Sequence, residues 1–261
     1  MPMLMLISPA KTLDFETPAP VDQFTQADFL DQSALLMKVL RKKTAGDLAA
    51  LMDVSDKIAQ LNVERNKSWQ TPFTLQNAKQ ALFAFKGDVY TGLAADTLPL
   101  DRLDYLQTHL RMLSGLYGLL RPYDLMQPYR LEMGTKLTNS RGADLYQFWG
   151  KRITQKVNEA LEQMGEGTVL VNLASNEYYA AIKPKLLSAR VVTPVFKDGK
   201  NGQYKTISFF AKKARGLMVR YAAENNVSQV ENLKGFDFDG YRFDATTSTA
   251  DQWVFLRDER A

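Results

Sequence analysis

Helix-forming and strand-forming segments follow one another irregularly along this chain, and that order constrains its fold more than any other feature. Two short, largely apolar runs, Leu4–Ser8 and Val169–Leu173, have the length of buried strands. Several helical patterns lie between them, so strands and helices do not alternate as they do in a doubly wound sheet. No linker-like or repetitive stretch divides the 261 residues. The sequence therefore predicts a single integrated α+β domain over 1–261, with a mixed β-sheet flanked by helices.

Hydrophobic spacing and capping residues predict the individual elements. Helices are expected over 28–43, 45–52, 55–69, 75–85, 101–113, 145–164, 176–182 and 211–225. Asp144 can cap the longest of them, and Gly165 can end it. Further strands are expected over 190–196, 204–210, 241–243 and 253–256. The turn residues Asp198–Gly202 predict a hairpin between the first two of these strands.

The residue inventory excludes several kinds of chemistry. The chain has no cysteine, so disulfides, thiolate catalysis, Cys-ligated zinc and iron–sulfur clusters are excluded. His109 is the only histidine. Its position in a predicted helix, beside Leu110 and Arg111, favours a structural role over a place in a Ser-His-Asp triad. No spacing of histidine and carboxylates suggests a metal site, so we expect no metal. Glu132, Asp144 and Glu177 could supply acid–base chemistry, but their spacing singles none of them out, and we expect no catalytic residue and no cofactor.

The lengths of the apolar runs predict where in the cell the protein is found. The run at the N-terminus, Met3–Ile7, is too short for a signal peptide and has no basic residues before it. No later stretch approaches the roughly 18 apolar residues of a membrane span. We therefore expect a cytoplasmic monomer with no membrane partner.

The segment 183–220 is exceptionally basic. It holds ten Lys or Arg residues against one acid, Asp198. In the predicted helix 211–225, one half of the helical wheel carries Lys212, Lys213, Arg215 and Arg220. Such a face can neutralise phosphates and bind a polyanion in a salt-dependent way, and a plain solvated face is the alternative.

Gly216 lies inside this basic arc. A glycine within a helix costs about 1 kcal/mol relative to alanine, so its presence needs an explanation. Two explanations stay open at this point. A phosphate backbone approaches the helix closely there, or a neighbouring element of the protein packs closely against it.

Residues 48–61 resemble a helix-hairpin-helix DNA-binding motif, whose second helix holds a phosphate at its N-terminus. The apolar positions of the motif are matched by Leu48, Leu51, Val54 and Ala59. Lys57 matches a common basic position. Asp53 and Ser55 stand where the motif has glycines, and Asp53 would repel a phosphate. Ser55 can cap the second helix instead, and a plain helical hairpin is the alternative.

Two loops suggest a competing, enzymatic reading. The loop after the first strand, Ser8–Thr12, offers Lys11 and two hydroxyls to a phosphate but lacks P-loop glycines. With Lys86, Asp88 and Glu132, Lys11 would form a polar pocket of a nucleic-acid- or nucleotide-modifying enzyme. A third reading is that the basic face binds an acidic protein partner.

Six segments, in order, resemble the YaaA family of bacterial peroxide-stress proteins. They are LISPAKTLDF (6–15), AFKGDVYTGL (84–93), HLRMLSGLYGLLRPYDLMQPYRLEMG (109–134), DLYQFWG (144–150), NLASNEYY (172–179) and ISFFAKKARGLMVRY (207–221). The resemblance covers essentially the whole chain. It implies a single unusual α/β fold that binds DNA through a helix-hairpin-helix and a positively charged cleft. It also implies a role in limiting free intracellular iron under hydrogen peroxide.

The resemblance also implies site residues, by matching position. The hairpin falls at 52–57 and includes Ser55 and Lys57. The cleft residues would be Lys11, Lys86, Arg111, Arg121, Arg130, Lys212, Lys213, Arg215, Gly216 and Arg220. We therefore predict a DNA-binding protein that recognises backbone and shape. Since no carboxylates cluster in the sequence, we expect its effect on iron to be indirect.

Overall fold

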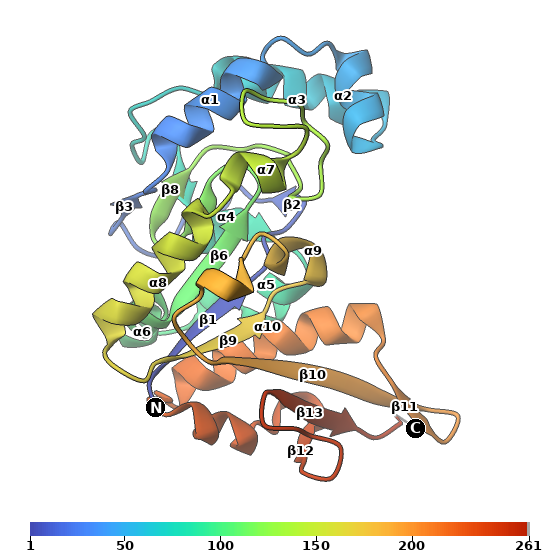
Figure 1. The fold of residues 1–261 in the computed structure, drawn as a ribbon. Helices are drawn as coiled ribbons and strands as arrows, with labels where there is room; N and C mark the ends of the chain where they lie inside the picture. Colours follow the sequence, from blue (N-terminus) through green and yellow to red (C-terminus); the bar gives the residue numbers. More distant parts are fainter. Residues whose placement is uncertain (260–261) are drawn as a thin grey trace.

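The main β-sheet organises the fold in the computed structural model, which describes residues 1–259. Its strands lie in the order β12-β13-β10-β9-β1-β6-β7, and β11 pairs with β10 (Figure 1). Their bounds are β1 Met3–Ile7, β6 Leu110–Ser114, β7 Gly118–Leu120, β9 Val169–Leu173, β10 Val191–Lys200, β11 Gln203–Lys205, β12 Arg242–Asp244 and β13 Gln252–Arg257.

The five inner strands β6, β1, β9, β10 and β13 run parallel, whereas β7, β11 and β12 are antiparallel to their neighbours. Every residue of β1, β6 and β9 is buried. Helices cover both faces of such a sheet, which explains the continuous apolar runs of β1 and β9. Helix α8 packs against β1 and β7, whereas α10 packs against β10, α5 and α6 behind the sheet as seen in Figure 1.

Two small sheets lie beside the main one. Strand β2 (Thr12–Leu13) pairs with β5 (Phe85–Lys86). Strand β8 (Asp124–Met126) pairs with both β3 (Thr25–Gln26) and β4 (Lys79–Gln80). The β3–β8–β4 sheet joins the long excursion between β1 and β6 to the segment that follows β7.

Ten α-helices and four 3-10 helices are present in residues 1–259. The α-helices are α1 Leu30–Leu40, α2 Ala45–Met52, α3 Asp56–Ser68, α4 Ala81–Ala84, α5 Asp88–Leu93, α6 Leu100–His109, α7 Leu145–Trp149, α8 Arg152–Met164, α9 Asn176–Tyr179 and α10 Ser208–Glu224. The 3-10 helices are η1 Ala95–Thr97, η2 Pro184–Leu186, η3 Val230–Gly235 and η4 Phe238–Gly240. Helices α1, α2 and α3 stand together at one end of the molecule (Figure 1). No helix in the described range is long and apolar enough to cross a membrane.

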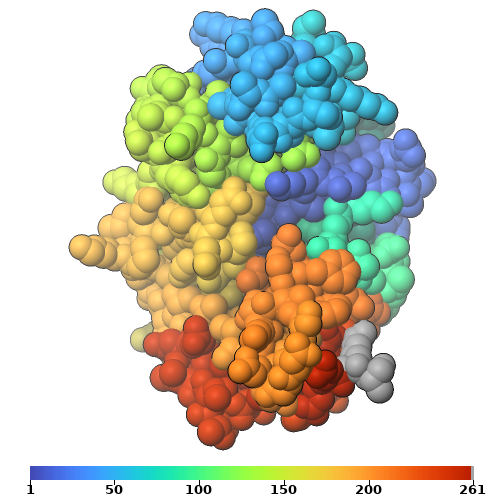
Figure 2. Space-filling model, turned by 90° about the vertical axis from the view of Figure 1, so that its right-hand side faces the viewer, coloured from blue at the N-terminus to red at the C-terminus, as the bar shows by residue number. Residues whose placement is uncertain are grey.

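The carboxyl ends of β1 and β9 form a topological switch point. The chain leaving β1 leads to β6 on one side, and the chain leaving β9 leads to β10 on the other. In sheets of this type, ligands bind in the crevice that such diverging connections leave open. Figure 2 looks toward this edge of the sheet. Segments after β1 (dark blue), after β8 (lime) and at the start of α10 (orange) gather there below α2 and α3.

The predicted class is confirmed: the protein is α+β, with a mixed sheet flanked by helices. The helices around 45–52 and 55–69 are confirmed as α2 and α3. The predicted hairpin is confirmed between β10 and β11, but its turn is shorter than 198–202 because Asp198, Gly199 and Lys200 already pair with β11. Its Asn201 and Gly202 both adopt positive φ angles, 53° and 73°, as tight hairpin turns require.

Four predicted elements differ most from the structure. Within 75–85 only Ala81–Ala84 is helical, because the buried Lys79–Gln80 pairs with β8. The helix predicted to end at residue 113 ends at His109, and the next apolar residues form β6. The helix 145–164 is divided at Gly150, where φ is 54°. The strand predicted over 204–210 ends at Lys205, since Ser208 already begins α10.

Candidate functional site

Ser8 and Ser175 connect the loops that follow β1 and β9 at the switch point. The Ser175 backbone N–H donates to Ser8 Oγ at 2.9 Å, and the Ser8 hydroxyl donates to Ser175 Oγ at 3.3 Å. The Tyr90 hydroxyl donates to the Ser8 carbonyl at 3.1 Å, which ties α5 to the same point. These bonds fix the loops that follow both strands. Any ligand at this edge would therefore contact loops that these hydrogen bonds hold in place.

Two of the predicted cleft residues, Lys11 and Arg130, meet at Glu132. Lys11 Nζ lies 2.8 Å from Glu132 Oε2, and an Arg130 guanidinium nitrogen lies 3.4 Å from Glu132 Oε1. The Lys11 side chain is 61% exposed, whereas that of Arg130 is only 17% exposed. The Nε of Arg130 is buried and has no hydrogen-bond partner in the described part of the chain. One carboxylate thus faces two cations, one of them incompletely satisfied.

A third cation, Arg65 of α3, adds to this cluster. Arg65 is half-buried, and its side chain has no hydrogen-bond or carboxylate partner within residues 1–259. Burial lowers the pKa of Arg65, and the nearby positive charge of Arg130 lowers it further. Such uncompensated guanidinium groups are suited to an anion. We call Lys11, Arg65, Arg130 and Glu132 the arginine cluster. Arg65 is not among the predicted site residues, because nothing in the helical pattern distinguishes it from the other polar residues of α3.

Lys86 lies near this cluster through β2–β5 pairing. In that pair Thr12 is opposite Lys86, so Lys86 stands beside the loop that carries Lys11. Its Nζ is 3.5 Å from Asp14 Oδ2, and its side chain is 65% exposed. The backbone N–H and hydroxyl of Thr17 donate to Asp14, and these bonds hold the pKa of Asp14 well below its usual range. Lys86 therefore lies next to a firmly ionised carboxylate. Asp88, of the same predicted pocket, is the first residue of α5.

The predicted basic face of α10 is divided in the structure. Arg220 donates to the carbonyls of Leu93 and Ala94 and to Thr97, and it pairs with Glu224 at 2.7 Å. It therefore stabilises the C-terminal end of α5 and is not a free cation. Lys213 Nζ lies 3.9 Å from Asp239, whereas Lys212 is exposed and has no carboxylate partner in the described chain.

Arg215, on another side of α10, lines a small cavity of about 160 Å³ at the carboxyl end of β9. The four basic residues of the predicted face thus point toward different surroundings. They do not form one continuous surface along the helix.

Gly216 is explained by packing. A methyl group at this position would stand 1.8 Å from the carbonyl oxygen of Val89 in α5. Gly92 of α5 makes the reciprocal approach, because its methyl group would stand 2.2 Å from the carbonyl of Lys213. Of the two explanations that the sequence leaves open for Gly216, the structure supports close packing, since the residue is buried between α10 and α5.

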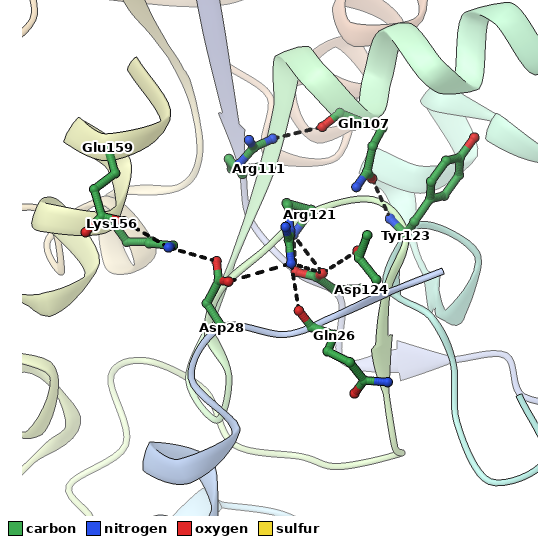
Figure 3. Close-up of polar contacts among 10 residues, drawn as sticks. Gln26, Asp28, Gln107, Arg111, Arg121, Tyr123, Asp124, Lys156 and Glu159 are labelled. Carbon is green, nitrogen blue, oxygen red and sulfur yellow. Dashed lines mark hydrogen bonds and ion pairs between the residues drawn. The ribbon is translucent and has the colours of Figure 1, made fainter. Parts of the chain in front are cut away.

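Arg111 and Arg121 lie elsewhere, in an internal charge network (Figure 3). Arg111 stands at the start of β6, whereas Lys11 follows the end of the parallel strand β1. The Arg111 guanidinium donates to the carbonyls of Gln107 and Leu110 at 3.0 and 2.8 Å. Burial lowers the pKa of Arg111 to about 10.

Arg121 is held by two carboxylates of the same network. It lies 2.9 Å from Asp124 and 3.6 Å from Asp28, and Lys156 of α8 joins Asp28 at 3.4 Å. Figure 3 shows Asp28 between Lys156 of α8 on one side and Arg121 on the other. With Glu159 beside Lys156, the three cations of the network face three carboxylates. The structure therefore does not bring Arg111 and Arg121 into the arginine cluster, and their charge is internally balanced.

The helical hairpin α2–α3 presents an exposed turn. Asp53 adopts the left-handed conformation (φ 50°, ψ 59°) that glycine favours, at the place of the first glycine of the helix-hairpin-helix motif. Ser55 occupies the N-cap position of α3, but its side chain makes no capping bond, so the predicted cap is wrong. Ser55 and Lys57 are both exposed. The first backbone N–H groups of α3 are orphan donors of the kind that bind phosphates.

His109 has the structural surroundings that its sequence position suggested. Its ring stacks on Tyr105 with centroids 4.0 Å apart, and Nδ1 lies 2.9 Å from the Tyr105 carbonyl. Within residues 1–259 no three His, Asp or Glu side chains are grouped so that they could hold a metal ion.

Nearly the whole chain is similar in sequence to known proteins. The sequence profile of the family described as "Peroxide stress protein YaaA" matches residues 3–247. A UPF0246 protein of Aliivibrio fischeri strain MJ11 is 63% identical over 258 residues, which cover 99% of each chain. A UPF0246 protein of Chromobacterium violaceum is 61% identical over 256 residues, covering 98% of this chain and 99% of the relative. The protein therefore belongs to the peroxide stress protein YaaA family.

Proposed function

We propose that the protein binds the sugar–phosphate backbone of DNA on the face shown in Figure 2, where the carboxyl edge of the sheet meets α3. The observation that carries this proposal is the arginine cluster. Arg65 has no partner in the described chain, the Nε of Arg130 is buried and unpaired, and the two positive charges repel each other. A phosphate placed between them would relieve that repulsion and accept the unpaired donors.

The charge of the segment 183–220 supports the same proposal. Its single acid, Asp198, is buried and paired with Arg257 at 2.5 Å, so it does not offset the surface charge. Six lysines of the segment have no carboxylate partner within residues 1–259: Lys183, Lys185, Lys197, Lys200, Lys205 and Lys212. Most belong to the β10–β11 hairpin and the start of α10, at the carboxyl edge of the sheet. Lysines of this kind strengthen binding to any polyanion and make it salt-dependent.

The α2–α3 hairpin would supply a second phosphate contact. Its turn is exposed, the N–H groups at the start of α3 lack a side-chain cap, and Lys57 lies on the first turn. Arg65 belongs to the same helix, α3. A duplex held at both places would be read through its backbone and shape. In a cell under peroxide stress, such binding would limit iron-driven DNA damage by covering the DNA, without an iron site in the protein.

The test is DNA binding by fluorescence anisotropy, with a labelled 20-base-pair duplex at several salt concentrations. We expect Arg65→Gln and Arg130→Gln each to weaken binding by about tenfold. Each should also reduce, by about one, the slope of the logarithm of the binding constant against the logarithm of the salt concentration. The matched control is Arg190→Gln, because Arg190 pairs with Asp251 at the opposite, amino-terminal end of β10. Equal binding by all three variants and the wild type would overturn the proposal.

A further inference from the structure

The cavity that contains Arg215 is separate from the arginine cluster and has its own chemistry. It lies where β9 ends, between that strand, β10 and the first turns of α10. Its volume is about 160 Å³. Polar side chains in its lining are Asn172, Asn176, Thr193, Thr206, Arg215 and Gln252. No Asp or Glu contributes to this lining, so the cavity has a net positive charge.

Arg215 is an unusual charge because nothing in the described chain compensates it. The side chain is largely buried, yet it makes no hydrogen bond and no ion pair within residues 1–259. Burial alone lowers the pKa of Arg215. Removing a guanidinium from water without a partner costs free energy, whereas an apolar side chain on this helix would cost none. The other buried arginine near β10, Arg257, has Asp198 and Asp239 as partners.

The groups around Arg215 are arranged to donate hydrogen bonds. Asn172 Oδ1 already accepts the backbone N–H of Ala174 at 3.1 Å, which leaves its amide N–H₂ as the available group. The hydroxyls of Thr193 and Thr206 can donate as well. Ala211 of α10 also lines the cavity, so the positive end of this 17-residue helix lies beside it. An anion with several acceptor oxygens satisfies these donors better than any neutral group.

We propose that the Arg215 cavity binds a phosphate group, as a phosphomonoester carried either by a free nucleotide or by the end of a DNA strand. This site would add to the proposed DNA-binding function, and it rests on that function where the phosphate belongs to the end of a DNA strand. A guanidinium binds two phosphate oxygens at once, and the amide and hydroxyl donors take the others. The cavity holds one such group and the start of its sugar, whereas a continuous duplex backbone must stay on the open surface.

Two binding assays distinguish the sources of the phosphate. Calorimetry compares deoxyadenosine monophosphate with deoxyadenosine, which differ only in the phosphate. Anisotropy compares one duplex with and without 5′-phosphates. The proteins are the wild type, Arg215→Gln, Arg215→Lys and, as the matched control, Arg190→Gln.

We expect the wild type and Arg190→Gln to prefer the phosphorylated ligand by at least tenfold in one of the two assays. Preference in the first assay identifies a free nucleotide, and preference in the second identifies a DNA end. Arg215→Gln should abolish that preference, and Arg215→Lys should retain part of it. The melting temperature of Arg215→Gln should equal or exceed that of the wild type, because an uncompensated charge is removed.

The proposal is overturned if neither assay shows a phosphate preference, or if Arg215→Gln keeps the full preference. Failure of the broader DNA-binding proposal has a different signature. In that case the wild type does not bind the unphosphorylated duplex at all, while the nucleotide assay remains readable.

Discussion

Gly216 of α10 lies directly against the carbonyl oxygen of Val89 in α5, so close that a methyl group would stand 1.8 Å from that oxygen. Gly92 makes the reciprocal approach to Lys213. The two glycines let the helices cross almost in backbone contact. This crossing holds α10 in place, and with it Arg215 and Lys212.

The Gly216→Ala variant should lower the free energy of unfolding by about 2–3 kcal/mol, because the methyl group overpacks the crossing. Urea denaturation measures the change. Gly46→Ala in α2 is the matched control: the nearest atom to its methyl group would be 3.9 Å away, so a gain of about 0.5–1 kcal/mol is expected. Weaker DNA binding without loss of stability in Gly216→Ala would restore the phosphate-contact explanation.

Removing the buried carboxylate of Asp198 should be strongly destabilising. Arg257 would lose its closest partner and the Tyr241 hydroxyl its acceptor, in a site where both ion-pair side chains are 5% exposed. We expect Asp198→Ala to cost about 3–5 kcal/mol in chemical denaturation. Asp258→Asn is the control, because Asp258 pairs with Arg242 at 2.7 Å on the surface and should matter far less. Similar losses in the two variants would contradict the prediction.

The stability of the protein should fall on mild acidification because of His109. Burial lowers the pKa of His109 below the ordinary value of 6.5. The unfolded chain therefore takes up the proton first, so stability is complete above about pH 6.5 and declines as the pH falls toward the folded-state pKa. His109 is the only histidine, so the two imidazole C–H signals in proton NMR give its pKa directly. His109→Gln should reduce the loss of stability between pH 7 and 5, and a pKa at or above 6.5 would refute the prediction.

Asp53 should limit DNA binding at the α2–α3 turn. The residue holds a left-handed conformation and places a negative charge beside the free N–H groups of α3. Asp53→Gly should raise stability by about 0.5–1 kcal/mol by relieving the backbone, and should raise DNA affinity several-fold at low salt. Asp53→Asn separates the two effects, since it removes only the charge. Anisotropy that is unchanged in both variants would argue against a phosphate contact at this turn.

Local sequence signals determined much of the secondary structure. Asp144 accepts the backbone N–H of Gln147 at 2.8 Å and begins a helix, as its cap position predicted. Asn201-Gly202 makes the β10–β11 turn, and the apolar runs at 3–7 and 169–173 became the buried strands β1 and β9. These features depend on neighbouring residues, which is why sequence patterns identify them. For Leu110–Ser114 the predicted helix is wrong, because a short apolar run suits a helix or a strand equally well. The pairing of this segment with β1 decides for the strand.

The sequence by itself determined the α+β class, the excess of basic residues in 183–220 and the absence of cysteine chemistry. Only the tertiary structure decided which charged side chains are neutralised by an internal partner and which are available to a ligand. It paired Arg220, Arg121 and Asp198 internally, left Arg65 and Arg215 without partners among residues 1–259, and brought Lys11 to Arg130 through Glu132. Whether a charge is neutralised depends on groups tens of residues away, which no local pattern specifies. For the same reason a glycine in a basic helix face proved to serve the packing of two helices.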